Sequence, residues 1–456
     1  MTNPPDAVTP VTPEVTIIGG GLAGCEAAWQ AAAFGCRVTI HEMKPERYTP
    51  AHHSPHLAEL VCSNSLRSAA SDSAVGLLKD EMRALGSLII AQAELHRVPA
   101  GKALAVDRDL FAAGVTQAIS QHPLIQVIHH EVSGLPANCG MDPTHPLILA
   151  SGPLTTAELA QSLGELTGED SLAFYDAIAP IISVDSLDRS IIYQASRYDD
   201  GPGDYLNCPM NRDEYQAFID ALGAANTVPL KAFEEPKYFE GCLPIEVMLA
   251  RGRDTLRFGP MKPVGLPDPR TGRDPFAVVQ LRLENVAGTQ VNMVGFQTKL
   301  TYPEQKRVFA MIPGLAHAEF TRLGSIHRNT FVCAPKVLTR FLQVQGRPGL
   351  LLAGQITGVE GYVESTAMGL LAGRNAACLT LGLPLSAPEA DTAHGALLQH
   401  LTASVAKHFQ PSNVNFGLFP DLDLRLPKRQ RGEYRAHHAL ASLAQWQQSP
   451  TGRPLG

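Results

Sequence analysis

The sequence predicts an α/β fold, in which a domain with a parallel sheet is interrupted by a mixed α/β insertion domain. Three observations predict it. A strand–helix–strand unit with a Gly-rich turn occupies residues 14–42, and two further apolar strands end in small residues at 146–152 and 349–355. Between them, residues 191–345 are rich in Pro, aromatic residues and alternating strands. Similar strands on both sides of a dissimilar segment indicate that the two ends of the chain build one sheet.

The Gly-rich turn has the spacing of a dinucleotide-binding fingerprint. The apolar run at residues 15–18 indicates a buried strand, residues 19–24 fit G-x-G-x-x-G, and an Ala-rich helix is expected from about 22 to 34. The first Gly of this pattern makes a tight turn, the second lets backbone N–H groups approach a pyrophosphate, and the third lets the helix pack on the strand. The helix N-terminus, with roughly half a positive elementary charge, then faces the phosphates.

An acidic residue ends the second strand of this Rossmann-like unit. The strand is expected at residues 37–41 and is followed by Glu42, where a carboxylate can accept hydrogen bonds from a ribose diol. A 2′-phosphate is disfavoured there because two negative groups would meet. Glu42 therefore favours NAD or FAD, and the position near the N-terminus together with the later strands favours FAD. The predicted cofactor contacts are Gly19, Gly20, Gly21, Leu22, Ala23, Gly24 and Glu42.

Later segments extend the same domain. A helix is expected at 106–120 and a strand at 125–128, and the strand at 146–152 has the ending common in two-dinucleotide-binding flavoproteins of the glutathione-reductase type. The strand at 349–355 leads into an Ala/Gly-rich helix at 364–379, whose N-terminus is a second place where a helix dipole can face a flavin. This region adds Gly354, Gln355 and Gly361 to the predicted cofactor contacts.

These patterns predict the domain boundaries. We expect a disordered leader at 1–13, the first part of the FAD-binding domain at 14–190, the insertion domain at 191–345, and the second part with a C-terminal tail at 346–456. Inside the insertion, residues 276–284 alternate between apolar and polar side chains, which predicts a half-buried strand. Residues 287–288 form a plausible turn into a partner strand at 290–296.

Composition excludes several classes of protein. The chain has 456 residues, 45% of them hydrophobic and 18% charged, and no run of 18 apolar residues that would predict a membrane span. The leader lacks the basic and apolar regions of a signal peptide. Eight scattered cysteines without a C-x-x-C motif therefore indicate thiols in a reducing cytoplasm. The net charge of −7 argues against a uniformly basic nucleic-acid binder but allows a local basic patch.

Two cysteines stand in unusual surroundings. Cys62 lies among short polar residues near Arg67, which could stabilise a thiolate. Cys242 lies between Gly and Leu-Pro, so a constrained turn is expected, and four basic residues follow within twenty positions. Those cations could activate the thiol or hold phosphates, or they could form an ordinary solvated face. The cations are Arg251, Arg253, Arg257 and Lys262.

The remaining cysteines and a histidine group have simpler interpretations. A packing role is the default for an intracellular cysteine, because cysteine is among the most buried residue types. His52, His53 and His56 have no matching cysteine or carboxylate set nearby, so no metal site is predicted. The packing role is assigned to Cys25, Cys36, Cys139, Cys208, Cys333 and Cys378.

Seven segments together resemble a known family. They are GGGLAGCEAAW, LVCSNSLRS, YFEGCLPIE, DTLRFGPMKPVGL, HRNTF, LLAGQITGVEGYVES and FQPSNVNFGL. The family is that of the folate- and FAD-dependent tRNA (uracil-5-)-methyltransferases, and the resemblance runs from about residue 14 to 435 without a departure at the motif positions. The central blocks are far more specific than the Gly-rich turn.

The resemblance implies a reaction and a set of roles. In the family, 5,10-methylenetetrahydrofolate supplies a carbon to C5 of the T-loop uridine, reduced FAD carries and reduces it, and NAD(P)H recharges the flavin. Cys242 is the expected nucleophile at uracil C6 and Cys62 its partner near the flavin, although these two roles could be exchanged. Tyr362 and His327 are expected beside the folate. Expected tRNA contacts are Arg251, Arg253, Arg257 and Lys262, with Lys428, Arg429, Arg431 and Arg435 near the C-terminus.

Three other functions remain open at this stage. The larger FAD enzyme that modifies wobble uridines has a similar GQI-x-G-x-x-GY block, but it has a longer chain with a C-terminal helical domain. A plain NAD(P)H-dependent flavin oxidoreductase, with structural cysteines, is a second possibility, and a non-catalytic FAD-bound RNA-binding protein is a third. Folate-dependent formation of ribothymidine separates all three from the family's reaction. No NAD(P)H site is evident, and the oligomeric state stays open.

Overall fold

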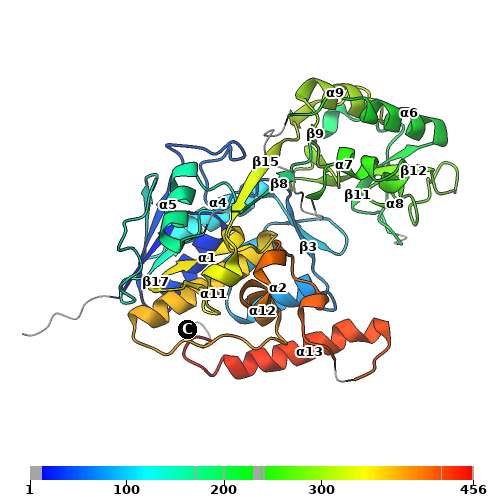
Figure 1. The fold of residues 1–456 in the computed structure, drawn as a ribbon. Coiled ribbons are helices and arrows are strands. Elements are labelled where there is room, and N and C mark those ends of the chain that lie inside the picture. Colours follow the sequence, from blue (N-terminus) through cyan, green and yellow to red (C-terminus); the bar gives the residue numbers. More distant parts are fainter. Residues whose placement is uncertain are drawn as a thin grey trace, which may run out of the picture.

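The structure is a computed structural model that describes residues 13–169, 172–198, 201–229, 238, 242–422 and 424–453. The described chain forms two units, each with its own sheet and its own buried core. Figure 1 shows the second unit standing apart from the first and joined to it by β8 and β15. Nearly all of the predicted leader, and residues 239–241 of the second cysteine block, lie outside the described residues.

The first unit contains a parallel sheet built from both ends of the chain. Its strand order is β16-β17-β7-β1-β2-β6, and every pair is parallel except β16 with β17. The predicted α/β fold class is confirmed, because strands from before and after the second unit are direct neighbours in this sheet. The strands are β1 (Glu14–Ile18), β2 (Arg37–Glu42), β6 (Ile125–His129), β7 (Leu147–Leu149), β16 (Gln343–Val344) and β17 (Arg347–Leu352).

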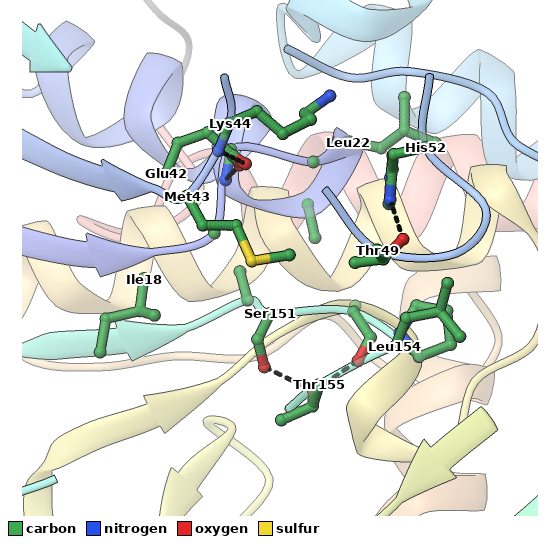
Figure 2. A pocket seen from close by; sticks show the side chains of 18 of the residues that line it. Ile18, Leu22, Glu42, Met43, Lys44, Thr49, His52, Ser151, Leu154 and Thr155 are labelled. Atoms are coloured by element: carbon green, nitrogen blue, oxygen red, sulfur yellow. Dashed lines mark hydrogen bonds between the residues drawn. The ribbon is translucent and has the colours of Figure 1, made fainter. Parts of the chain in front are cut away.

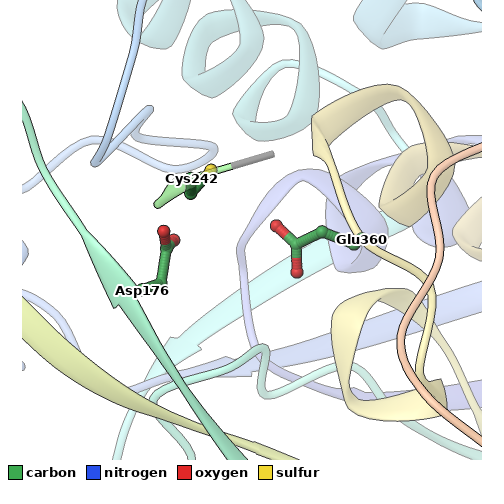
Figure 3. Close-up of side chains that lie close together, drawn as sticks. All are labelled: Asp176, Cys242 and Glu360. Atoms are coloured by element: carbon green, nitrogen blue, oxygen red, sulfur yellow. The ribbon is translucent and has the colours of Figure 1, made fainter. Parts of the chain in front are cut away.

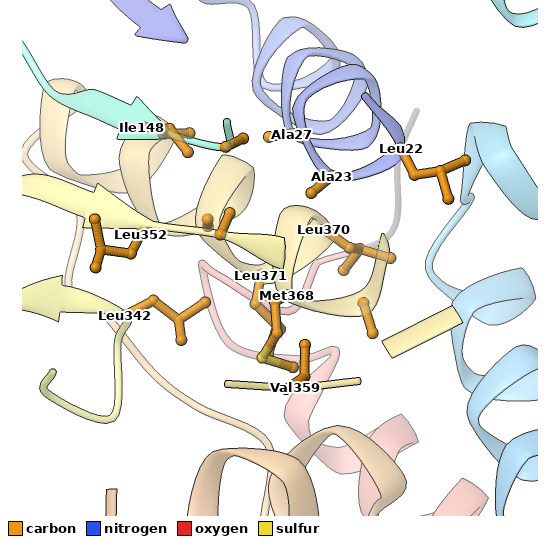
Figure 4. Close-up of a cluster of buried hydrophobic side chains, with 14 of the residues drawn as sticks. Leu22, Ala23, Ala27, Ile148, Leu342, Leu352, Val359, Met368, Leu370 and Leu371 are labelled. Atoms are coloured by element: carbon orange, nitrogen blue, oxygen red, sulfur yellow. The ribbon is translucent and has the colours of Figure 1, made fainter. Parts of the chain in front are cut away.

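Two helices pack across this sheet with almost no space between their backbones. They are α1 (Leu22–Ala33) and α11 (Tyr362–Thr380). A Cβ atom on Gly369 would lie 2.2 Å from the carbonyl oxygen of Ala23, and one on Gly373 would lie 2.3 Å from that of Ala27. Small residues therefore set the spacing, and Figure 4 shows Ala23 and Ala27 facing the leucines of α11 in the buried core.

The other elements of the first unit surround these two helices. A short antiparallel sheet of order β3-β5-β4 follows the second strand, and the C-terminal helices α12 and α13 pack against α2. The elements are β3 (Ser65–Ser68), β4 (Arg97–Val98), β5 (Ala103–Val106), α2 (Ala74–Ala84), α3 (Leu88–Leu95), α4 (Arg108–Ser120), α5 (Ala157–Thr167), α10 (Ala334–Val337), α12 (Ala393–Ala403), α13 (Lys428–Trp446), and the 3-10 turns η3 (Gly354–Thr357), η4 (Ala406–His408) and η5 (Phe416–Leu418).

The second unit is an antiparallel sheet covered by short helices. Its strand order is β10-β11-β12-β13-β9-β14. Aromatic residues fill its core, with Phe296 between Phe218 and Phe309. The elements are β9 (Ile181–Ser183), β10 (Tyr193–Gln194), β11 (Tyr205–Met210), β12 (Ala277–Leu283), β13 (Gln290–Met293), β14 (Phe320–Arg322), α6 (Arg212–Gly223), α7 (Ile245–Ala250), α8 (Thr255–Phe258), α9 (Tyr302–Phe309) and η1 (Val184–Ser186).

The prediction for residues 276–284 was right about the strand but wrong about its exposure. β12 is buried on both faces, including Gln280 and Arg282. Arg282 donates hydrogen bonds to Asn64 and Ser63, which belong to the segment that carries Cys62. The polar face of the strand therefore packs on the first unit instead of facing water. Asn292 on the neighbouring β13 also donates to Asn64, so one asparagine joins the two sheets.

A two-stranded ribbon connects the units. It pairs β8 (Leu172–Ala177) with β15 (Ile326–Phe331) in antiparallel register, and His327 lies directly opposite Asp176. Directly opposed residues place their side chains on the same face of a ribbon. Both side chains therefore face the same side of the junction between the two units.

The C-terminal segment is tied to the sheet helices by one buried cation. Arg374 of α11 donates hydrogen bonds to the side chain of Gln30 and to the carbonyl groups of Leu85, Thr451 and Arg453. Because a buried guanidinium needs all of these partners, the segment around residue 451 is part of the first unit's core. Among the helices in the described ranges, none combines the length and apolarity that a bilayer crossing requires.

The helix contact generates a stability prediction. Gly369→Ala is expected to lower the free energy of unfolding by about 2 kcal/mol, because the added methyl meets the Ala23 backbone and overpacking costs about 1–3 kcal/mol. The matched control is Gly164→Ala in α5, where the nearest atom is 3.4 Å away and better helix propensity is expected to leave stability equal or higher. Thermal unfolding without flavin measures both. Equal transition temperatures would contradict the close contact.

Candidate active site

A deep cavity opens at the carboxyl end of the parallel sheet, where dinucleotides bind in open α/β folds. Figure 2 shows that its wall is formed by the Gly-rich turn, the segment after β2 and the segment after β7. The loop after β17 and the start of α11 complete it. Nine of the residues singled out in the sequence line this cavity, namely Gly19, Gly20, Gly21, Leu22, Ala23, Glu42, Gly354, Gln355 and Tyr362.

The Gly-rich turn fits a bound diphosphate. Gly21 is the N-cap of α1, no side chain caps the helix there, and a Cβ on Gly21 would meet nothing within 4 Å. The first N–H groups of α1 are therefore left open toward the cavity, which is the arrangement that binds phosphate at a helix N-terminus. Gly19 has φ +105° and packs against the carbonyl of Ala150, so this position requires glycine.

Two predicted contact residues shape the cavity without lining it. A Cβ on Gly24 would lie 1.8 Å from the carbonyl oxygen of Gly19, so Gly24 holds α1 against the turn. Gly361 has φ +108° and precedes α11, and a Cβ there would lie 2.4 Å from a carboxylate oxygen of Glu364. Both glycines are required by close packing.

Glu42 connects the turn to the end of β2. One carboxylate oxygen accepts a hydrogen bond from the Gly20 N–H at 2.7 Å, and the other accepts from the Lys44 N–H at 2.9 Å. Each oxygen still has a lone pair that can accept from a ribose hydroxyl. The buried carboxylate thus stiffens the phosphate-binding turn and remains able to bind a ribose.

Cys62 is held at the cavity by Tyr362. The tyrosine hydroxyl accepts hydrogen bonds from the backbone N–H groups of Cys62 at 2.7 Å and Ser63 at 3.2 Å, and it lies 2.9 Å from the Cys62 Sγ. Tyr362 is the first residue of α11 and lines the cavity. The first cysteine block is therefore fixed beside the wall of the cavity.

The cation that acts on Cys62 is Arg108, and not Arg67 as the sequence suggested. Arg67 forms an ion pair with the buried Glu364, so its positive charge is compensated by that carboxylate. Arg108 is the cation that lowers the Cys62 pKa, and it is itself paired with Glu284 at 2.5 Å. Burial outweighs this effect and raises the pKa of Cys62 to about 12. The resting group is therefore a thiol, contrary to the expected thiolate.

Cys242 lies in an acidic pocket. Its Sγ and carboxylate oxygens of Asp176 and Glu360 all lie within 4.8 Å of one another, as Figure 3 shows. Burial raises the pKa of Cys242 well above its usual value, and the negative charge of Asp176 raises it further. The same aspartate also raises the pKa of Cys62, so it acts on both thiols.

The main influences on the pKa of Cys242 are burial and negative charge, so the structure does not favour the activating role considered for the four cations. The structure places Arg253 in an ion pair with Asp220 at 2.6 Å, and it stacks the Arg257 guanidinium 4.2 Å from the Phe276 ring. Arg251 and Lys262 lie on the exposed surface of the second unit.

Sequence reasoning missed both carboxylates of this pocket. Glu360 lies within the GVEGYVES block, but the sequence pattern did not indicate a role for its carboxylate. Asp176 lies on β8 in an ordinary alternating strand, and only the pairing with β15 turns it toward Cys242. The one signal available was indirect, because a reaction that needs a thiolate also needs a nearby base.

His327 lies in the same region as a neutral ring. Its Nε2 is 2.8 Å from the Ser325 hydroxyl, and it lies opposite Asp176 across the ribbon. Burial, followed by the charges of Arg322 and His53, lowers the pKa of His327 to about 4. A neutral imidazole can donate or accept a hydrogen bond, so the ring can orient a polar ligand without adding charge.

Comparison with known proteins agrees with this arrangement. The profile of the family "Glucose inhibited division protein A" matches residues 14–384. The methylenetetrahydrofolate--tRNA-(uracil-5-)-methyltransferase TrmFO of Desulfotalea psychrophila is 63% identical over 433 residues, which cover 95% of this chain and 97% of that protein. The protein of the same name from Geobacter sulfurreducens is 59% identical, over 96% and 99% of the two chains. The chain therefore belongs to the family of methylenetetrahydrofolate--tRNA-(uracil-5-)-methyltransferases.

Solved structures support the fold of the family member described above. Aquifex aeolicus GidA, in its form II crystal, matches with a TM-score of 0.67 and 16% identity, over 96% of this chain and 74% of that chain. The form I crystal gives 0.68 and 15%, over 97% and 76%. At this identity the likeness shows a common fold only.

The second group of cations in this family member lies far from the first. Helix α13 carries Lys428, Arg429, Arg431 and Arg435. In the first group, Arg251 directly follows α7 and Arg257 belongs to α8. Figure 1 shows α13 along the lower side of the first unit and α8 above it in the second unit. The two predicted sets of tRNA contacts therefore do not form one patch.

The cavity generates a prediction that separates binding from folding. Gly21→Ala is expected to leave the protein folded, since the methyl meets no protein atom, but to lose most bound FAD because it occupies the phosphate position. Gly24→Ala is expected to lose FAD and also to melt at a lower temperature, because its methyl meets the Gly19 carbonyl. Flavin absorbance per protein and thermal unfolding without FAD measure the difference. Full flavin content in Gly21→Ala would contradict this site.

Proposed function

We propose that the chain methylates C5 of the T-loop uridine of tRNA, using 5,10-methylenetetrahydrofolate as carbon donor, FAD as cofactor and NAD(P)H as reductant. One observation carries the proposal. Cys62 is hydrogen-bonded to Tyr362, which lines the dinucleotide cavity, and Cys242, from a distant sequence block, lies beside Asp176, whose charge acts on both thiols. A plain flavin oxidoreductase has no need of two such thiols beside an acidic pocket. The name shared by relatives 55–63% identical to the chain supports the same reaction.

The cofactor would be held by the residues of the cavity. Gly19, Gly20 and Gly21 with the start of α1 would bind the diphosphate, and Glu42 would bind the ribose. Gly354 and Gln355 would lie near the flavin ring, and Leu22, Ala23, Gly24 and Gly361 complete or shape the wall. When bound, FAD would supply the redox chemistry that takes a hydride from NAD(P)H and reduces the transferred carbon.

The cysteines would activate the uracil. Uracil C5 is a poor nucleophile, and addition of a thiolate at C6 converts C5 into an enolate carbon that attacks an electrophilic methylene. Cys242 is our candidate for this addition, because it borders the acidic pocket and the second unit. Cys62 would assist the adduct or the removal of the C5 proton, since Tyr362 fixes it at the cavity. Folate would bind between Tyr362 and the neutral His327.

Binding of tRNA would depend on local charge. The net charge of −7 opposes long-range attraction to RNA, so local cations would have to supply the contacts. The candidates are Arg251, Arg253, Arg257 and Lys262, with Lys428, Arg429, Arg431 and Arg435 of α13. The target uracil lies inside a folded loop and would be extruded at a cost of a few kcal/mol. We further propose that the reaction takes place in the cytoplasm.

We also propose that the chain is organised as an FAD-binding domain at 14–190 and 346–456 with an insertion domain at 191–345. The two separate cores support a division of this kind. β9, at Ile181–Ser183, pairs only with β13 and β14 of the second unit, which favours a first junction a few residues earlier.

The reaction itself can be tested with labelled carbon. Purified protein, unmodified tRNA transcript, NADPH and methylenetetrahydrofolate labelled in its methylene carbon are expected to give labelled 5-methyluridine. Cys242→Ala is expected to reduce the label by at least about 1,000-fold, because the nucleophile is lost. Cys208→Ala, a buried cysteine in β11, is the matched control and is expected to remain active. No label from wild-type protein that holds FAD and oxidises NADPH would overturn the proposed function.

Salt dependence tests the RNA contacts. Arg251→Ala is expected to weaken tRNA binding and to reduce the slope of log K against log salt concentration by about one, because one phosphate contact is lost. Arg307→Ala is the matched control, since Arg307 is ion-paired with Glu304 on α9. Binding is measured by filter retention from 50 to 200 mM salt. An unchanged slope in Arg251→Ala would place the RNA elsewhere, and Lys428→Ala would then be tested in the same way.

A further inference from the structure

The acidic pocket contains a thiol that has to lose its proton before it can react. The Cys242 thiol is buried, and burial with nearby negative charge raises its pKa well above the usual value. The four arginine and lysine side chains predicted to activate it lie elsewhere. A neutral thiol is a weak nucleophile toward uracil C6, so a group in contact with Cys242 has to accept the proton.

Two carboxyl groups are close enough to accept it. Both Asp176 and Glu360 have an oxygen within 4.8 Å of the Cys242 Sγ. Glu360 is buried, its carboxyl accepts a hydrogen bond from Gln355, and burial with the charge of Asp176 raises its pKa well above the usual value. The raised pKa favours the protonated form of Glu360, so Glu360 is the less suitable acceptor of the proton.

Asp176 differs from Glu360 in its hydrogen bonds. Burial raises its pKa to about 6, while hydrogen bonds from Cys242, the Ala177 N–H and Asn329 limit the rise. Among the described residues, its buried Oδ1 has no hydrogen-bond partner. Asp176 is thus a carboxylate, largely ionised at neutral pH, that already accepts a hydrogen bond from the Cys242 thiol and has a further acceptor atom without a partner. A pair of carboxyl groups with separated pKa values is the usual basis for dividing acid and base roles.

The other neighbours do not compete for the proton. His327, opposite Asp176 on β15, is bound to Ser325 and its low pKa makes it a weak base. Burial keeps Cys62 protonated, and Tyr362, whose pKa is raised well above its usual value, is bound to Cys62. His327, Cys62 and Tyr362 are therefore neutral neighbours of Asp176.

Resting on the proposed function, we propose that Asp176 is the general base that takes the proton of the Cys242 thiol when the target uracil enters the site. The S–H bond breaks, an O–H bond forms on Asp176, and a bond forms between Sγ and uracil C6. The electron pair of the C5–C6 double bond moves into the enolate. When the thiolate later leaves C6, the proton returns from Asp176 to Sγ, so the enzyme ends unchanged.

The test follows formation of the thiol–uracil bond. Holoenzyme is mixed with NADPH, methylenetetrahydrofolate and tRNA transcript containing 5-fluorouridine, because fluorine at C5 prevents loss of the C5 substituent and leaves the protein–RNA bond intact. The covalent adduct is measured on denaturing gels from pH 5 to 9.5. Asp176→Asn is expected to form adduct at least about 100-fold more slowly at pH 7, since general base catalysis contributes about 10²–10⁴-fold.

The pH profile distinguishes a base from a structural residue. Wild-type rates are expected to fall about tenfold per pH unit below about pH 6, where Asp176 becomes protonated and can no longer accept the proton. In Asp176→Asn the rate is expected to keep rising about tenfold per pH unit above pH 6, without the wild-type plateau, because the thiol then has to ionise unaided. Asp176→Glu is expected to restore part of the rate. The matched control is Asp185→Asn, an exposed residue of η1.

Specific outcomes overturn the inference. A rate in Asp176→Asn within threefold of wild type at pH 7, or a wild-type rate that is constant down to pH 5, excludes Asp176 as the base. Flavin content and NADPH oxidation verify each variant, and the wild-type profile decides alone if Asp176→Asn does not retain FAD. Failure of wild-type protein to form any adduct would count against the proposed function, whereas adduct formation by both proteins would remove only this inference.

Discussion

The close contact between α1 and α11 is the constraint on which the rest of the structure depends. Gly369 and Gly373 allow the two backbones to approach, and this fixes both helix N-termini at the same edge of the sheet. One N-terminus opens onto the phosphate-binding turn, and the other begins with Tyr362, which holds Cys62. A bulkier contact would separate the cofactor site from the cysteine, so the chemistry depends on residues that have no side chain.

Burial, more than charge pairing, controls the reactive groups. Burial favours the protonated forms of both cysteines and of Glu360 and the neutral form of His327, because desolvation penalises each charged form. Such a site is unreactive until a substrate changes its surroundings. A buried resting thiol is also less exposed to oxidation than a free thiolate, since oxidation follows thiolate character and accessibility.

Local patterns in the sequence predicted the parts of the fold that depend on local physics. The Gly-rich turn, the Ala-rich helices and the strand at 276–284 follow from backbone geometry and periodicity, which a single segment carries. The exposure of that strand was wrong because the partner that buries Arg282 is Asn64, from another unit. Asp176 was missed for the same reason, as its neighbour on β15 comes much later in the chain. The cations that follow Cys242 in the sequence were a misleading signal, because residues separated by a helix can be close in sequence and still point in different directions.

The order of strands in the parallel sheet has a consequence for synthesis on the ribosome. β7 pairs with β1 on one side and with β17 on the other, and β17 is made only after the whole second unit has been translated. The second unit can therefore close its own sheet on the nascent chain while the first unit still has an open strand edge. The cofactor pocket is incomplete until α11 has left the exit tunnel, so flavin can be held only after the second unit has been made.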